Sequence, residues 1–243
     1  MLTRAGLFDR DNLLCLDNPA NFQNTMNVTG ACYVPNSWTT DLGNEWVLAT
    51  HKPSYFSGYV FRADLRDPLV ILESGFSIGA VSHGRDLDQV VSGALGGITD
   101  HYGVSTSVCA SATTQYVTNK FSMYNFNIWY FCGYIYLIDA VHFKGFAIPS
   151  PRPNHPIAIR FPHLREIYEV NFPHFIPNFK IVGVVYPPGH DGLSPWPNYP
   201  SKLFLAVNPY YSASFVYGHQ KTGTEAAKVV ADRFNVMHGW VVV

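Results

Sequence analysis

The sequence predicts an α+β domain in which strands dominate and pair mostly antiparallel. Runs of aromatic and β-branched residues recur, as in YVFRAD (59–64), GYIYLIDA (133–140) and KIVGVVY (180–186), and such runs favour strands. Helical patterns are few, and they do not alternate with the strands as a parallel α/β fold requires. We therefore expect one or two mostly antiparallel sheets with helices packed outside them.

In chain order, the middle of the sequence supports seven elements. We expect a strand at 59–64, a helix at 84–95 with Leu87, Val90, Val91 and Leu95 on one face, a strand at 102–107, a helix at 109–119, and strands at 133–140, 169–172 and 180–186. Outside this zone, KLFLAVNPYY (202–211) and SASFVYG (212–218) resemble strands, and a final helix is expected to start at Thr224.

These elements divide the chain into three zones. Residues 1–55 are rich in Asn, Asp, Thr and Gly and predict an irregular lead-in with a strand or two, packed on the core. Residues 56–187 carry the organised pattern and form that core. Residues 188–243 hold a Pro-rich connection, strands and the C-terminal helix, and we expect them to belong to the same domain.

Composition excludes several classes of function. The 243 residues carry a net charge of −1, which gives no electrostatic reason for bulk binding to nucleic acid or to an anionic membrane. No apolar run reaches the roughly 18–20 residues that span a bilayer, and no signal peptide is visible at the N-terminus. The content of 47% hydrophobic residues indicates a globular chain with a sizeable core.

Common site motifs are absent. The sequence has no phosphate-binding P-loop, no G-x-G-x-x-G and no H-E-x-x-H. Its four cysteines, Cys15, Cys32, Cys109 and Cys132, form no C-x-x-C and no zinc spacing. We expect no metal site, and the cysteines are compatible with either disulfides or buried thiols.

Three polar positions occur in order on predicted strands: Arg62, Ser105 and Glu169. Their segments resemble mono-ADP-ribosyltransferases of the cholera toxin, heat-labile enterotoxin and pertussis toxin family. VFRADLRDP resembles the family's opening strand, GVSTS its Ser-Thr-Ser strand, and GYIYLIDA the strand that follows. EVNFPHFIPNFKIVGVVY resembles the segment with the catalytic glutamate, including the seven-residue step to Ile-Pro. The resemblance covers residues 59 to about 186.

This resemblance implies the family's split β-sandwich, with NAD as co-substrate in a cleft between the sheets and helices at the periphery. It implies that Arg62, Ala63 and Asp64, with Ser105 and Thr106, contact NAD. Glu169 would be the catalytic carboxylate, assisted by Arg62 and Ser105. The chemistry agrees, because a guanidinium binds pyrophosphate and a carboxylate stabilises the positive ribose of an oxocarbenium-like transition state.

Two positions depart from the family pattern. Ile167 stands where arginine-specific members have a glutamate and many others a glutamine, and Glu166 lies one residue out of register. Gln89 stands where the toxins have a histidine near the NAD ribose and is expected to bind NAD in its place, with His83 as a neighbouring alternative. The acceptor therefore stays open between a cysteine, an asparagine, another side chain and a nucleobase, with protein favoured over nucleic acid.

The neighbours of these positions carry further expectations. Asp64 and Arg66 alternate on the face of Arg62 and are expected to pair or to brace the site. The run AIRFPHLREIY (158–168) is expected to hold the acceptor loop, with Phe161 and Tyr168 either contacting the target or packing. The C-terminal zone has no cysteine, so a pentameric binding subunit is not expected.

The sequence therefore predicts a toxin or effector, secreted or injected, that transfers ADP-ribose from NAD to a macromolecule inside a target cell. Two alternatives remain. One is an NAD glycohydrolase, which gives ADP-ribose to water and is suggested by Ile167. The other is a degenerate module that binds NAD or a partner without turnover, suggested by Ile167 and Gln89.

Overall fold

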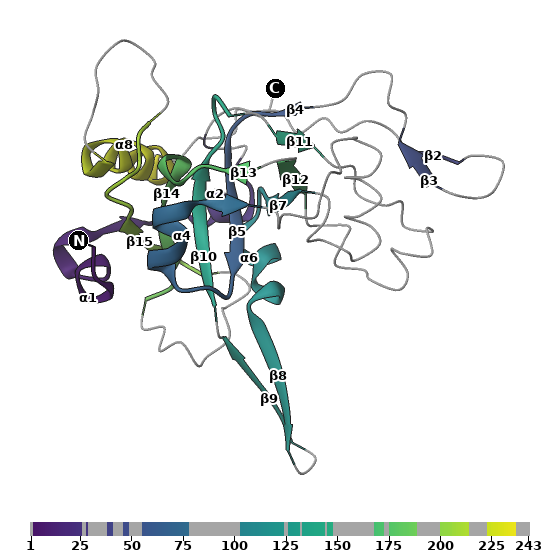
Figure 1. Cartoon of the computed structure of the whole chain (residues 1–243), viewed down its shortest axis with the longest axis horizontal. Coiled ribbons are helices and arrows are strands. Elements are labelled where there is room, and N and C mark those ends of the chain that lie inside the picture. Colours follow the sequence, from purple (N-terminus) through teal and green to yellow (C-terminus); the bar gives the residue numbers. More distant parts are fainter. Residues whose placement is uncertain are drawn as a thin grey trace.

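A large antiparallel sheet with few helices forms the body of the protein in the computed structural model, which confirms the α+β class (Figure 1). The structure describes residues 2–25, 28, 38–40, 46–48, 55–77, 103–123, 126–131, 133–143, 145–147, 168–172, 175–188, 200–213 and 223–236. Within these residues the sheet has nine strands, in the spatial order β1 (Leu13–Leu16), β15 (Leu203–Val207), β14 (Ile181–Tyr186), β10 (Tyr134–Asp139), β5 (Tyr59–Asp64), β7 (Val104–Ser107), β12 (Glu169–Phe172), β11 (Gly145–Ala147) and β4 (Tyr55–Phe56).

Short helices and three small strand pairs complete the described elements. The helices are α1 (Arg4–Leu7), η1 (Arg10–Asn12), α2 (Pro19–Gln23), α4 (Pro68–Ser74), α6 (Ala110–Thr113), η3 (Thr114–Tyr116), η5 (Asn178–Lys180) and α8 (Gly223–Asn235). The pairs are β2 (Trp38–Thr40) with β3 (Trp46–Leu48), β6 (Phe76–Ser77) with β13 (Phe175–Ile176), and β8 (Thr118–Met123) with β9 (Phe126–Phe131). The β8–β9 pair extends away from the body (Figure 1).

Each face of the sheet packs against its own core cluster. Because side chains of a strand alternate between the two faces, neighbouring residues of one strand belong to different clusters. On β5, Tyr59, Phe61 and Ala63 join one core cluster, whereas Val60 joins a second cluster on the opposite face. The first cluster includes residues of α8, and the second includes residues of α4. Arg62 shares the strand face of Val60, so the alternation directs this cation toward the side of the sheet that α4 covers.

Helix α8 covers the first face through one apolar stripe. Its buried residues are Ala226, Ala227, Val230, Ala231 and Phe234, which recur at helical spacing. Phe234 is fully buried, and its ring centroid lies 5.6 Å from that of Tyr59 and 6.3 Å from that of Phe61. The helix predicted from Thr224 is thus confirmed, with its start at Gly223.

Helix α4, which the sequence analysis did not predict, turns the chain back over the second face. The Asp67 carboxylate accepts a hydrogen bond from the Leu69 N–H, and Pro68 occupies the first turn, which are two standard signals of a helix start. Gly75 ends it with φ of 77°, and a Cβ there would lie 2.3 Å from the Ile176 carbonyl oxygen. The turn places Phe76 at the start of β6, next to the functional end of β5.

Most of the other elements agree with the sequence analysis. Strands 59–64, 133–140, 169–172 and 180–186 are confirmed to within a residue or two, and the strand at 102–107 is confirmed from Val104, whereas the strand predicted at 202–211 ends at Val207. The helix predicted at 109–119 is wrong at its C-terminal end, because α6 and η3 end at Tyr116 and Thr118 enters β8 to pair with Phe131. Ser212 and Ala213 are not in a strand, and the predicted helix at 84–95 lies outside the described residues.

The sheet is weakly paired between two of its neighbouring strands. Strands β5 and β7 are joined by one residue pair, Phe61 with Ser107, whereas β10 and β5 pair over six positions. The nine strands therefore form a group of five and a group of four that diverge beyond Phe61. A split sandwich with an NAD cleft stays a prediction, as do the domain limits at 55 and 187. No helix in the described ranges is long and apolar enough to cross a membrane.

We expect Phe234→Ala to lower the free energy of unfolding by about 3–5 kcal/mol, because it removes a fully buried ring between α8 and the sheet. Urea denaturation measures the change. Val236→Ala, at a position 51% exposed near the end of the same helix, is the control and should change stability by less than about 0.5 kcal/mol. Equal effects of the two substitutions would contradict the packing described for α8.

Candidate active site

A pocket of about 270 Å³ opens where β5 and β7 diverge. Its lining residues are Arg62, Ala63, Asp64, Leu65, Ser105, Thr106, Ser107, Thr113, Tyr116 and Glu169. All three side chains singled out by the sequence as catalytic, Arg62, Ser105 and Glu169, therefore meet in one hollow. Of the predicted cofactor-binding residues, Ala63, Asp64 and Thr106 also line it, and Gln89 lies outside the described residues.

A short hydrogen bond in the pocket joins Ser105 to Glu169. The Ser105 hydroxyl donates a hydrogen bond of 2.6 Å to Oε1 of Glu169. Strand register explains this contact, because Glu169 pairs with Ser107 and Asn171 with Ser105, so that Ser105 and Glu169 are diagonal neighbours across β7 and β12. A short donor to a carboxylate of this kind fixes the orientation of the carboxylate.

Burial dominates the electrostatics of Glu169. Loss of hydration raises the pKa of its carboxyl above the usual value, and the hydrogen bonds from Ser105 and Asn171 and the charge of Arg62 offset only part of that effect. A carboxylate with a raised pKa beside a pocket is a common mark of a functional site. The proton affinity of Glu169 therefore depends, besides burial, on Ser105 of β7, Asn171 of β12 and Arg62 of β5.

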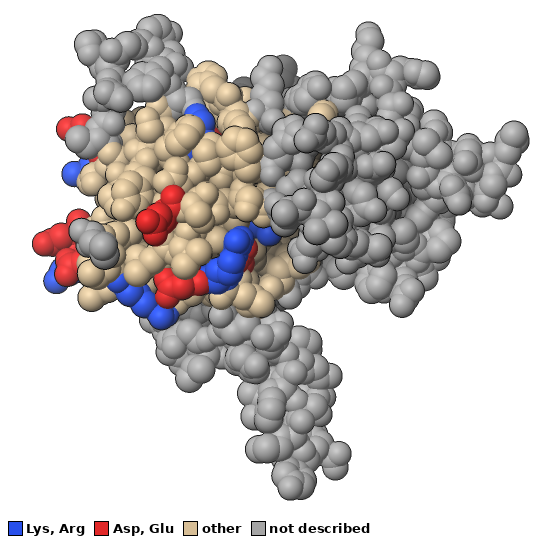
Figure 2. All heavy atoms as spheres, in the orientation of Figure 1, with Lys and Arg blue, Asp and Glu red and all other residues tan. Residues whose placement is uncertain are grey.

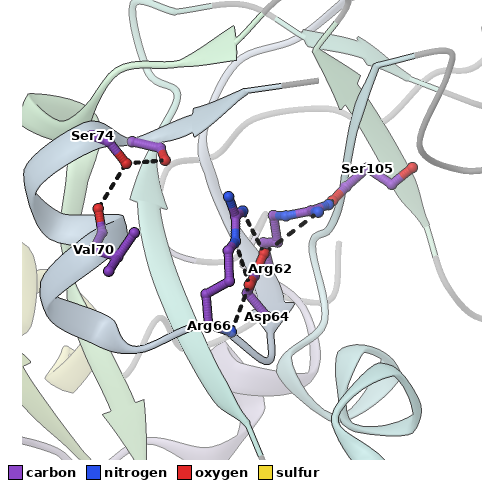
Figure 3. Close-up of polar contacts among 7 residues, drawn as sticks. Arg62, Asp64, Arg66, Val70, Ser74 and Ser105 are labelled. Carbon is purple, nitrogen blue, oxygen red and sulfur yellow. Dashed lines mark hydrogen bonds and ion pairs between the residues drawn. The ribbon is translucent and has the colours of Figure 1, made fainter. Parts of the chain in front are cut away.

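Arg62 bridges the gap between the diverging strands. Its Nη1 donates a hydrogen bond of 2.7 Å to the backbone carbonyl of Ser105, which β5 itself does not pair with (Figure 3). The guanidinium carbon also lies 5.1 Å from the ring centroid of buried Phe76, a cation–π contact. Arg62 is therefore held by both strand groups, and its side chain stays 23% exposed toward the pocket.

Asp64 and Arg66 pair with each other, as the sequence predicted. Nε and Nη2 of Arg66 each donate a hydrogen bond of 2.8 Å to Asp64, and its backbone N–H adds a third of 3.0 Å (Figure 3). Arg62 lies 3.8 Å from the same carboxylate. Burial would raise the pKa of Asp64, but the hydrogen bonds from Arg66 and the charges of both arginines outweigh it, and the pKa is lowered.

Basic and acidic side chains lie next to each other along the lower edge of the described face in Figure 2. This is the pattern expected where arginines are braced by carboxylates, as Arg62 and Arg66 are by Asp64. This pairing explains why charged residues gather at the end of β5. A partly buried guanidinium is costly unless a carboxylate and hydrogen-bond acceptors surround it.

The other two hydroxyls of the Ser-Thr-Ser strand have different partners. Thr106 is buried and donates a hydrogen bond of 2.6 Å to the carbonyl of Val170, so it ties β7 to β12. The Ser107 hydroxyl accepts a hydrogen bond of 2.9 Å from the Cys109 N–H at the start of α6. Ser105, the first serine of the motif, donates its hydrogen bond to the carboxylate.

Sequence reasoning missed several residues that line the pocket or contact its lining side chains. Asn171 is 2% exposed and contacts both Ser105 and Glu169, and its position two residues after Glu169 on a strand was a usable signal. Tyr116, at 52% exposure, and Leu65, at 55%, line the pocket as exposed apolar groups. No sequence signal places Tyr116 there, because it depends on how α6 and η3 fold.

The residue before the carboxylate has an unusual backbone. Tyr168 has φ of 48°, in the left-handed region that non-glycine residues rarely adopt, and its side chain is 37% exposed. Its carbonyl accepts a hydrogen bond of 3.3 Å from the Val108 N–H. The other positions discussed for the acceptor loop, Phe161, Glu166 and Ile167, lie outside the described residues, as does His83.

Cysteine and metal chemistry add nothing to this pocket in the described ranges. Cys15 and Cys109 carry free thiols, and Cys32 and Cys132 lie outside the described residues. Among the described side chains, no group of three His, Cys, Asp or Glu residues is arranged to hold a metal ion. The polar side chains that line the described pocket offer carboxylates, hydroxyls and a guanidinium.

Comparison with models of known protein families gives no match, and no curated protein matches significantly. Among solved structures, Scabin toxin from Streptomyces scabies in complex with NADH is similar at 23% identity and a TM-score of 0.41, over 62% of this chain and 81% of Scabin. A guanine-specific ADP-ribosyltransferase with NADH and GDP is similar at 21% identity and a TM-score of 0.38, over 62% of this chain and 83% of that one. At these low TM-scores the likeness does not define the function of this chain.

Asp64→Asn is expected to lower the free energy of unfolding at pH 7 by about 1–2 kcal/mol, because one charge-assisted pair is lost. Since the pKa of Asp64 is lowered in the folded state, its stabilisation is present above the pKa of an unfolded aspartate, about 3.9. The difference between wild type and variant should shrink as the pH falls below that value. Denaturant unfolding from pH 7 to pH 3 measures it, with exposed Asp232→Asn as control.

Glu169→Gln is expected to raise the melting temperature at neutral pH, because the raised pKa of Glu169 means that its ionised form is disfavoured by folding. A group with a raised pKa stabilises the folded state below its unfolded pKa, about 4.3 for glutamate, and loses that contribution as the pH rises. The gain should therefore disappear below about pH 4. Scanning calorimetry at pH 7 and pH 4 checks this, and a lower melting temperature at pH 7 would contradict it.

Proposed function

We propose that this chain is an NAD-dependent mono-ADP-ribosyltransferase. The observation that carries the proposal is the 2.6 Å hydrogen bond from Ser105 to Glu169 in a pocket that also contains Arg62. The three residues come from three strands, β7, β12 and β5, and each belongs to a separate segment that resembles the toxin family. Their meeting in one hollow is what the ordered motifs require.

Arg62 is the proposed anchor for NAD. Its guanidinium lines the pocket, and Phe76, Asp64 and the Ser105 carbonyl hold it in place. A planar guanidinium binds a pyrophosphate through parallel N–H donors, and a fixed one spends little conformational entropy in doing so. Ala63 and Asp64 form the pocket wall beside it.

Glu169 is the proposed catalytic carboxylate. Breaking the bond between nicotinamide and ribose develops positive charge on the ribose, and a partly buried carboxylate stabilises such charge more strongly than one in water, because less water screens it. The Ser105 hydroxyl fixes Oε1 in place. With the carboxylate ionised, it can also accept a hydrogen bond from the ribose or polarise the attacking group of the acceptor.

The pocket suits part of a dinucleotide. It combines a cation, a carboxylate and hydroxyls with exposed apolar groups of Leu65 and Tyr116 at its lining, and most nucleotide pockets mix these features. Its volume of about 270 Å³ lies just below the range of ~300–1,000 Å³ that is typical of sites for whole ligands. We therefore assign the ribose and nicotinamide end of NAD to it.

The remaining assignments belong to the same proposal. The acceptor is a macromolecule, with protein favoured over nucleic acid, and the chain acts as a secreted or injected toxin or effector inside a target cell. Residues 56–187 form the catalytic core, with the flanking zones packed on it. Transfer to water is the second candidate, because Ile167 stands where many transferases have a glutamine or glutamate that positions the acceptor.

Glu169→Gln is expected to lower NAD turnover about 10²- to 10³-fold with little change in NAD binding, because a neutral amide cannot stabilise the positive ribose. The measurement is nicotinamide release from NAD labelled in the adenylate part, with and without a eukaryotic lysate. Glu73→Gln makes the same chemical change at an exposed position of α4 and should leave turnover unchanged.

The label separates the candidate functions. Labelled lysate material that depends on Glu169 supports the transferase, and its sensitivity to protease or nuclease identifies the class of acceptor. Nicotinamide release with the label in free ADP-ribose alone supports the glycohydrolase. Binding of NAD without nicotinamide release, equal in wild type and the Gln variant, would exclude both enzymes and leave a binding module.

A further inference from the structure

Asn171 forms a polar link between the two groups at the centre of the pocket. Its Nδ2 donates to the Ser105 hydroxyl at 3.3 Å and to Oε1 of Glu169 at 3.4 Å. Because the Ser105 hydroxyl donates in turn to the same Oε1 at 2.6 Å, the three side chains form a closed triangle. The amide thus acts on the carboxylate both directly and through the serine.

The orientation of the amide follows from charge. An ionised carboxylate accepts hydrogen bonds and donates none, so the NH₂ group of Asn171, not its carbonyl, must face Glu169. Oδ1 then points the other way, and in the described structure it is buried without a hydrogen-bond partner. Leaving a buried acceptor unpaired costs free energy. Such a cost is expected where a side chain such as Asn171 serves to hold a neighbouring group, here Glu169.

The chain makes room for this arrangement at Gly103. A Cβ at that position would lie 2.1 Å from Oδ1 of Asn171, and its φ of 125° also favours glycine. Asn171 is 2% exposed, so the amide cannot turn away into solvent. The backbone of Gly103, which directly precedes β7, and the position of the Asn171 amide are therefore matched to each other.

We infer that Asn171 is a positioning residue that orients the Glu169 carboxylate and the Ser105 hydroxyl for catalysis. The catalytic role of Asn171 rests on the proposed function, whereas its hydrogen bonds to Ser105 and Glu169 do not. Asn171 does not line the pocket, so it acts through its two neighbours and does not touch the substrate. The donated hydrogen bond favours the ionised carboxylate, the form that the reaction uses.

Other groups also act on Glu169 and must be kept apart from this effect. Arg62 of β5 contributes its positive charge, and Tyr116 of η3 lies close enough to interact electrostatically with the carboxylate. Asp64 lines the same pocket. None of these is altered by a substitution at 171, so a change in the titration of Glu169 in such a variant reports the amide.

Asn171→Ala is expected to lower kcat roughly ten- to a hundredfold with little change in KM for NAD, because a hydrogen bond to an ionised group is lost. The acid limb of the pH profile should move to higher pH, since Glu169 then holds its proton more tightly. Nicotinamide release from pH 4 to pH 8 measures both effects.

Asn171→Asp separates orientation from packing. Aspartate has nearly the shape of asparagine but lacks its NH₂ donors, so the substitution removes the donor while keeping the packing volume. Two carboxyl groups this close resist ionising together, so the Asp variant should hold a proton at the site to higher pH than the Ala variant and be the less active of the two at neutral pH. We expect kcat of the Asp variant to fall below that of the Ala variant.

Asn208→Ala is the matched control for loss of a buried asparagine. Asn208 is 0% exposed and donates to the backbone carbonyls of Asn178 and Ile181 at 2.9 and 2.8 Å. Its replacement should lower stability without moving the acid limb. An acid limb that stays in place in Asn171→Ala, or an Asp variant more active than the Ala variant, would overturn the inference.

A readout independent of turnover keeps this test separate from the proposed function. The pKa of Glu169 is measured by NMR of the ¹³C-labelled glutamate carboxyls, with Glu169→Gln assigning the resonance. A higher pKa in Asn171→Ala supports the contact even if wild type consumes no NAD, in which case only the proposed function fails. An unchanged pKa overturns the inference even if wild type is an active transferase.

Discussion

The pocket depends on Arg62, whose side chain links β5 to β7 beyond the point where the two strands cease to pair. β5 and β7 meet at one residue pair and then diverge, and a sheet that opens in this way exposes backbone groups that need partners. The Arg62 guanidinium supplies a donor to the Ser105 carbonyl across the gap. The Arg62 side chain that links the two strands also lines the pocket as a cation. One residue therefore serves both the fold and the proposed binding of a ligand.

Holding a guanidinium in such a gap requires support from behind. Phe76 provides a ring face at 5.1 Å, and Asp64 provides a negative charge that Arg66 fixes in place. The result is two cations and one anion around a buried aromatic ring, with the excess positive charge beside the pocket. This environment favours an anionic ligand more than a free arginine on a surface would, because the cation is already desolvated and oriented.

The Glu169 carboxylate, which lines the same pocket, is destabilised in its charged form by burial. Burial disfavours the ionised form of Glu169, and the donors Ser105 and Asn171 and the charge of Arg62 recover part of that cost. A carboxylate kept in a poorly hydrated place is less stable when ionised, yet it interacts more strongly with positive charge that develops nearby. Local destabilisation at this position is therefore consistent with function rather than with packing.

The sequence by itself determined what depends on local spacing: the strands at 59–64 and 169–172, and the pairing of Asp64 at the end of β5 with Arg66 two residues further along the chain. Only the tertiary structure decided which residues meet across 64 or more positions, as Ser105 and Glu169 do. It brought Phe76 under Arg62 through the turn of α4, and it ended the predicted helix at 109–119 early because Thr118 pairs with Phe131. The physical reason is that periodicity reports the face on which a side chain lies, whereas the order and register of strands, which choose its neighbour, come from long-range packing.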